Sequence, residues 1–140
     1  MARRCACGLP QVIETERYLD DGTLFPTLWW LTCRSLSRAA GRLEGGGWMA
    51  AFNERLAADP GLAEALRAAT AAYVARRDGG GASGPVRHPG GGGMAGGRIK
   101  CLHAHTAHEL VAGDNPAGAE ALEELGWEDP VVPCVQPGGP

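Results

Sequence analysis

A glycine-rich stretch divides this chain and limits what it can fold into. Half of residues 79–98 are glycine, with four in succession from Gly90 to Gly93. Glycine loses more backbone entropy on folding than any other residue, so such a stretch favours neither a helix nor a strand. It lacks a Gly-Lys-Ser/Thr ending, which excludes a phosphate-binding P-loop. We therefore predict a flexible linker at residues 79–98, inside a single domain that spans residues 1–140.

The part before this linker predicts a β-hairpin followed by helices. Apolar and β-branched residues at 12–19 and 24–31 are typical of two strands, and Asp21-Gly22 between them is a good turn pair. Asp59-Pro60 is a strong helix start, because the Asp caps and the Pro occupies the first turn. Three helices are predicted here, at residues 36–44, 48–58 and 60–77.

The part after the linker predicts two further helices and a tail. The first continues from Lys100 to Ala112 and stops at Gly113. The second follows Asn115, which can cap it, and carries several acidic residues. Four prolines follow Trp127, so residues 126–140 are predicted to be an extended tail. The predicted fold class is α+β, with an N-terminal β-hairpin packed against four to five helices.

Residues 100–108 are the most chemically dense part of the chain, with three of its four histidines and one of its five cysteines. At about 100° per residue, Cys101, His105 and His108 would share one helix face, and His103 would point toward the core. A thiolate with imidazoles is a suitable ligand set for Zn²⁺. The alternative is ordinary packing, with two solvated histidines, a core His103 and a buried thiol.

The other cysteines extend this prediction. Cys5-Ala6-Cys7-Gly8 is similar to a metal-binding knuckle, although it also fits a flexible N-terminus with incidental thiols. Cys33 ends the second predicted strand, so the hairpin can return it toward that turn. We predict a tetrahedral zinc site formed by Cys7, Cys33, Cys101 and His108, with His103, Cys5 and His105 as further candidate ligands.

Composition narrows the classes of function. The net charge of −3 and a pI near 5.8 argue against a general nucleic-acid binder. No run approaches about 18 apolar residues, so no membrane span is predicted. The odd number of five cysteines and the absence of a signal-peptide pattern indicate reduced thiols and a cytoplasmic location.

Short sequence blocks fall in an order that resembles a known family. They are Cys7-Gly8-Leu9-Pro10, Asp21-Gly22, Phe25-Pro26-Thr27-Leu28, Leu31-Thr32-Cys33, Arg42-Leu43-Glu44, Lys100-Cys101-Leu102-His103 and Asn115-Pro116-Ala117-Gly118. This order resembles the bacterial domain-of-unknown-function family numbered 501, typical of high-GC Gram-positive bacteria, over residues 5 to about 125. The chain departs from the family pattern in its short stretch before Cys5, in Arg34, where members carry proline, and in its long glycine run.

The resemblance implies little chemistry, because the family has no established activity. Its genes often neighbour a septum-formation initiator and an exopolyphosphatase, which implies a cell-division or envelope context. The family motif matches Cys7, Cys33, Cys101, His103 and His108; Cys5 and His105 match it less well.

Three functions stay open from the sequence. The first is a metal-binding domain in which zinc has a structural role. The second is an accessory protein without metal, which would offer an exposed tryptophan, an acidic helix and the proline-rich tail to an unidentified protein partner. The third is an enzyme with Cys101 or Cys33 as nucleophile and His103 or His108 as base. No oxyanion donors or paired carboxylates are evident, so the sequence favours a non-enzymatic role.

Overall fold

A computed structural model describes residues 2–16, 18, 20–22, 25, 27–79 and 92–131. Within them, a three-stranded antiparallel sheet in the order β1-β2-β3 is formed by β1 (Arg3–Arg4), β2 (Pro10–Glu14) and β3 (Trp29–Leu31). Strands β2 and β3 pair in antiparallel register, so the predicted hairpin is confirmed, with shorter strands than expected. The short polar strand β1 was not predicted.

Alternation along the strands decides which side chains enter the core. Val12 and Leu31 are cross-strand partners and both are buried, whereas their neighbours Ile13 and Trp30 form the next pair and are exposed. This is the period of two expected for a sheet with one covered face. Trp29 is therefore a core residue, and Trp30 is the tryptophan of this pair that faces outward.

The described residues form five helices, which confirms the α+β class. They are α1 (Arg34–Gly45), α2 (Trp48–Ala58), α3 (Pro60–Gly79), α4 (Leu102–Ala112) and α5 (Pro116–Glu124). Asp59 caps α3 by accepting from the N–H groups of Gly61 and Leu62, and Asn115 caps α5 through Gly118 N–H. None of these helices has the length and hydrophobicity needed to cross a membrane.

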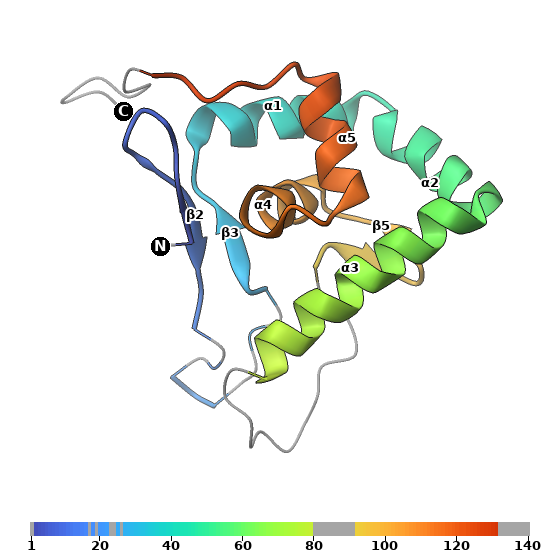
Figure 1. Cartoon of the computed structure of the whole chain (residues 1–140), viewed down its shortest axis with the longest axis horizontal. Coiled ribbons are helices and arrows are strands. Elements are labelled where there is room, and N and C mark those ends of the chain that lie inside the picture. Colours follow the sequence, from blue (N-terminus) through green and yellow to red (C-terminus); the bar gives the residue numbers. More distant parts are fainter. Residues whose placement is uncertain are drawn as a thin grey trace.

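Helix α4 lies between β3, α1 and α5 (Figure 1). Its Ala107 packs into a core with Val12, Trp29 and Tyr73. A second cluster joins Phe52 and Leu66 to residues from the β5 and α5 regions. Because α4 is covered on several sides, the geometry of its polar side chains is set by the elements around it.

A hairpin leads into α4 after the glycine-rich stretch. Strands β4 (Met94–Ala95) and β5 (Arg98–Ile99) pair in antiparallel register, and Gly96 and Gly97 between them both have positive φ. A two-residue turn with positive φ at both positions is accessible to glycine at little cost. This hairpin occupies the last residues of the predicted linker; residues 80–91 of that linker lie outside the described residues.

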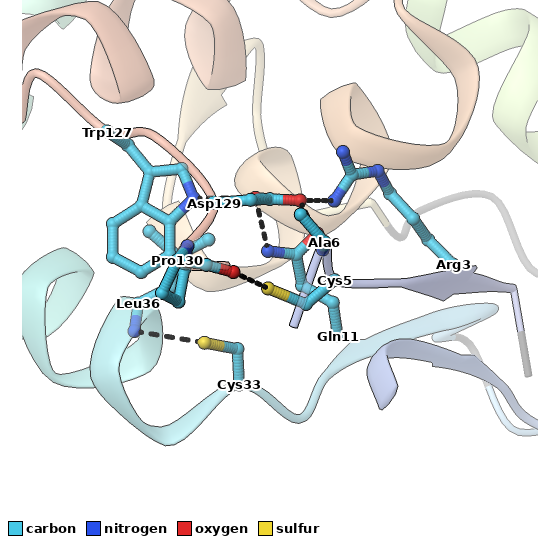
Figure 2. A network of polar contacts seen from close by, with 9 residues as sticks. All are labelled: Arg3, Cys5, Ala6, Gln11, Cys33, Leu36, Trp127, Asp129 and Pro130. Carbon is cyan, nitrogen blue, oxygen red and sulfur yellow. Dashed lines mark hydrogen bonds and ion pairs between the residues drawn. The ribbon is translucent and has the colours of Figure 1, made fainter. Parts of the chain in front are cut away.

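The segment after α5 returns to the N-terminal turn. Its Asp129 carboxylate accepts hydrogen bonds from four donors (Figure 2), which are Arg3 Nη1 (3.1 Å), Ala6 N (3.1 Å), Gln11 Nε2 (2.9 Å) and Trp127 Nε1 (3.1 Å). Partial burial raises the pKa of this carboxyl, but the hydrogen bonds outweigh it and hold the pKa at about 2. Residues 127–131 of the predicted tail are thus tied to β1 and β2, and residues 132–140 lie outside the described residues.

Replacing Asp129 by alanine tests whether its hydrogen bonds to the N-terminal residues stabilise the fold. We expect Asp129→Ala to lower the free energy of unfolding by about 2 kcal/mol, because it leaves the buried Gln11 amide and three other donors without their acceptor. Urea unfolding followed by circular dichroism measures the change. Glu128→Ala, at the exposed neighbouring position, is the control and should be close to neutral. Equal effects of the two substitutions would contradict the assignment.

Candidate metal centre

Three ligand-type side chains meet where α1 packs against the start of α4. Glu44 lies in the last turn of α1, Cys101 is the residue before α4, and His103 lies in the first turn of α4. One ligand atom from each lies within 4.8 Å of the other two, and all three residues are partly buried. This contact joins a helix that precedes the glycine-rich stretch to a helix that follows it.

The Glu44 carboxylate makes two contacts with residues at the start of α4. Its Oε1 accepts a hydrogen bond of 3.0 Å from the Leu102 N–H, and the same atom lies 2.7 Å from His103 Nδ1. A carboxylate is favourable at a helix N-terminus, where backbone N–H groups lack partners within the helix. The carboxylate therefore caps α4 from another helix and fixes where His103 lies.

The other ring nitrogen of His103 is fixed by the backbone of α1. Nε2 lies 2.9 Å from the Ser37 carbonyl oxygen, which can only accept, so Nε2 carries a hydrogen and donates it. Nδ1 faces the Glu44 carboxylate oxygen, and it is the nitrogen that a metal ion at this place would bind. A histidine whose second nitrogen donates to a carbonyl oxygen is the usual arrangement of a metal ligand.

Cys101 completes the group from the N-cap position of α4. Its backbone is extended, with φ −131° and ψ 108°, and its sulfur makes no capping hydrogen bond. Together with His103 it lines a cavity of about 410 Å³. Cys101 thus borders a space that a ligand can enter.

The predicted quartet of Cys7, Cys33, Cys101 and His108 does not form one ligand group within the described residues; the group that forms is Glu44, Cys101 and His103. Cys101 precedes the helix instead of belonging to it, so the 100° spacing that placed it beside His105 and His108 does not apply. The helix also turns His103 toward α1, although the sequence pattern placed it with the core.

The other described cysteines, Cys5, Cys7 and Cys33, lie outside this group, and Cys134 is outside the described residues. The Cys5 thiol donates to the Pro130 carbonyl oxygen at 3.8 Å, and the thiols of Cys5 and Cys7 are in hydrogen-bond contact. Burial raises the pKa of Cys5. Cys33 caps α1 by accepting from the Leu36 N–H at 3.4 Å (Figure 2). Cys5 and Cys7 therefore make contacts within and beside the N-terminal turn, and Cys33 caps the start of α1.

His105 and His108 are buried in a network around Asn115. The Asn115 Oδ1 accepts from the Gly118 N–H, so its Nδ2 donates to the Nδ1 atoms of His105 (3.0 Å) and His108 (3.1 Å). His108 Nε2 lies 2.8 Å from Asp114 Oδ1. Burial lowers the pKa of both imidazoles, to about 4 for His105, so both are neutral near pH 7. Neither joins the group of Glu44, Cys101 and His103.

Glu44 is the ligand-type residue that the sequence prediction missed. It belongs to the block Arg42-Leu43-Glu44, and Cys101 and His103 belong to the block Lys100-Cys101-Leu102-His103. An acidic residue in one block and a Cys-x-His in another was the available signal. Nothing in the local pattern of either segment shows that they meet.

Comparison with known proteins gives a match to a protein family. A model of the family described as "Protein of unknown function (DUF501)" matches residues 1–123. No curated protein and no solved structure matches the chain.

Proposed function

Because this chain belongs to the family of proteins of unknown function DUF501, its role has to be inferred from its own geometry. We propose that it is a metal-binding protein whose Glu44, Cys101 and His103 hold a zinc ion. The observation that supports this is the meeting of one oxygen, one nitrogen and one sulfur ligand atom within 4.8 Å. These are the donor types that Zn²⁺ takes in proteins.

The distances between the three ligand atoms are close to those around a zinc ion, so binding would need only small movements. Zinc–ligand distances are about 2.0–2.3 Å, so neighbouring ligand atoms around one tetrahedral ion lie about 3–4 Å apart. The Nδ1 of His103 and the Oε1 of Glu44, now 2.7 Å apart, would separate slightly to admit an ion between them. The Ser37 carbonyl oxygen accepts from Nε2, which leaves Nδ1 as the ring nitrogen for the metal.

The ion would have a structural role. It would join the end of α1 to the start of α4, and these two helices are separated in sequence by α2, α3 and the glycine-rich stretch. Closing such a long connection restricts the unfolded chain, so a metal there stabilises the fold. Three protein ligands would leave a fourth coordination position for water or another ligand, and two of the three, Cys101 and His103, line a cavity.

A cysteine–histidine enzyme is a weaker interpretation of the same residues. A nucleophilic thiol needs a base whose free nitrogen lies within hydrogen-bond distance. In His103, Nε2 is held by Ser37 and Nδ1 by Glu44, so the ring has no nitrogen directed to Cys101. The accessory role without metal stays a separate prediction, with Trp30 as its exposed tryptophan.

Elemental analysis of untagged protein tests the proposal. We expect about one zinc ion per chain, and at least about a 100-fold loss of affinity in Cys101→Ser and His103→Ala, because each removes a ligand. Glu44→Gln should weaken binding less, because an amide oxygen remains. A chelator competition assay measures the affinities.

Cys7→Ser is the matched control, since it removes a thiol that lies outside the group but belonged to the site predicted from sequence. It should retain zinc. Protein that neither carries zinc nor takes it up on dialysis would refute the proposal, and loss of zinc in Cys7→Ser without loss in Cys101→Ser would refute it as well.

A further inference from the structure

A cavity of about 410 Å³ opens beside the proposed metal centre. Its lining includes the polar residues Cys101, His103 and Lys100 and the apolar residues Trp29, Trp30 and Met94. A volume of this order falls within the range of small-molecule sites, which combine apolar walls with a few polar groups. The cavity thus has the composition of a ligand site as well as its size.

Trp30 gives one wall an exposed aromatic face. It is 51% exposed, because the alternation of β3 directs its neighbour Trp29 into the core and turns Trp30 outward. Its ring stacks on Phe25, with centroids 6.4 Å apart and planes at 26°. An indole held in this way offers a surface on which a planar apolar group can stack.

The charge of the described lining residues favours an anion. Lys100 is the only lysine in the sequence, and its backbone N–H is held by the Gly93 carbonyl at the cavity edge. None of the described residues that line the cavity is acidic. A zinc ion held by the Glu44 carboxylate, the Cys101 thiolate and a neutral His103 would balance the charges of these ligands and leave a vacant coordination position, which carboxylate oxygens fill readily.

We infer that this cavity binds a small carboxylate with a planar apolar body. Its carboxylate takes the fourth position on the metal and pairs with Lys100, and its body stacks on Trp30. The metal contact rests on the proposed function; the contacts with Lys100 and Trp30 do not. The inferred ligand class is therefore small aromatic acids.

Calorimetric titration of the full-length, zinc-loaded protein tests this inference. The probes are indole-3-acetate and indole-3-acetamide, which share a ring system and differ in the charge of the side chain. We expect the acid to bind at least about tenfold more tightly than the amide, since charge-assisted contacts are stronger than neutral ones. Lys100→Met, Trp30→Ala and removal of zinc should each weaken binding of the acid by about tenfold.

Arg42→Met is the control, because it removes a positive charge from an exposed position on α1 that does not line the cavity. It should leave the affinity unchanged. If zinc binds but the acid and the amide bind equally, or neither binds, the inference fails and the metal proposal stands. If no zinc binds and the acid still depends on Lys100 and Trp30, the metal proposal fails and the cavity assignment is supported.

Discussion

Gly118→Ala should lower the free energy of unfolding by about 3 kcal/mol or more, because no space exists for a methyl group at this position. A Cβ atom there would lie 2.2 Å from the His105 carbonyl oxygen and 2.6 Å from the Glu109 Cβ. The closest atom belongs to the backbone of α4, so the clash is relieved only if α5 moves away from α4. Urea unfolding followed by circular dichroism measures the loss.

Gly45→Ala is the matched control for this substitution. Gly45 is also helical, at the end of α1, and a Cβ there would meet nothing within 4 Å. Alanine has the higher helix propensity, so this variant should be unchanged or more stable by up to about 1 kcal/mol. If both variants were equally stable, α4 and α5 could not pack as closely as described.

Local sequence patterns predicted most elements of the fold. Asp59-Pro60 starts a helix because capping and the fixed φ of proline act within a few residues, and the same holds for Asn115. The alternation that buries Val12 and Leu31 is likewise a property of one strand and its neighbour. Helix caps and strand alternation depend on residues that are close in sequence, so they can be predicted from the sequence alone.

The candidate site depends on contacts that local patterns do not contain. The Glu44 carboxylate reaches the Leu102 N–H across 58 positions of sequence, and the Asp129 carboxylate reaches Arg3 across 126. The first contact forms because α1 packs against α4, and the second because the residues after α5 pack against β1. The spacing argument failed at Cys101 for a different reason: the helix was predicted to start at Lys100, two residues too early, so the extended Cys101 was treated as helical.

Acidification should destabilise the protein through its buried histidines. Burial lowers the pKa of His105 from the ordinary 6.5 to about 4, so the unfolded chain binds a proton that the folded chain rejects. The contribution of His105 is therefore complete above pH 6.5 and is lost as the pH falls toward 4. A difference of about 2.5 in pKa corresponds to about 3 kcal/mol.

Three other groups, His108, Glu109 and Asp129, also affect how the stability depends on pH. Burial also lowers the pKa of His108, although Asp114 opposes it, so His108 adds to the loss. Burial raises the pKa of Glu109, which opposes the loss because the folded state then binds the extra proton. The hydrogen bonds on Asp129 hold its pKa at about 2, so its contribution is lost only at lower pH. As the pH falls below 6.5, the two histidines lower the stability and Glu109 opposes them.

Urea unfolding at a series of pH values from about 7.5 to 5 measures that slope. His105→Asn removes the titrating ring and keeps an acceptor for the Asn115 amide, so it should be less stable near pH 7 and lose less on acidification. Leu66→Ala is the control: it also removes a buried side chain, lies in the other core cluster, and should keep the wild-type slope. Because only a group that titrates differently in the two states changes the slope, identical slopes for His105→Asn and wild type would show that His105 is not buried as a neutral imidazole.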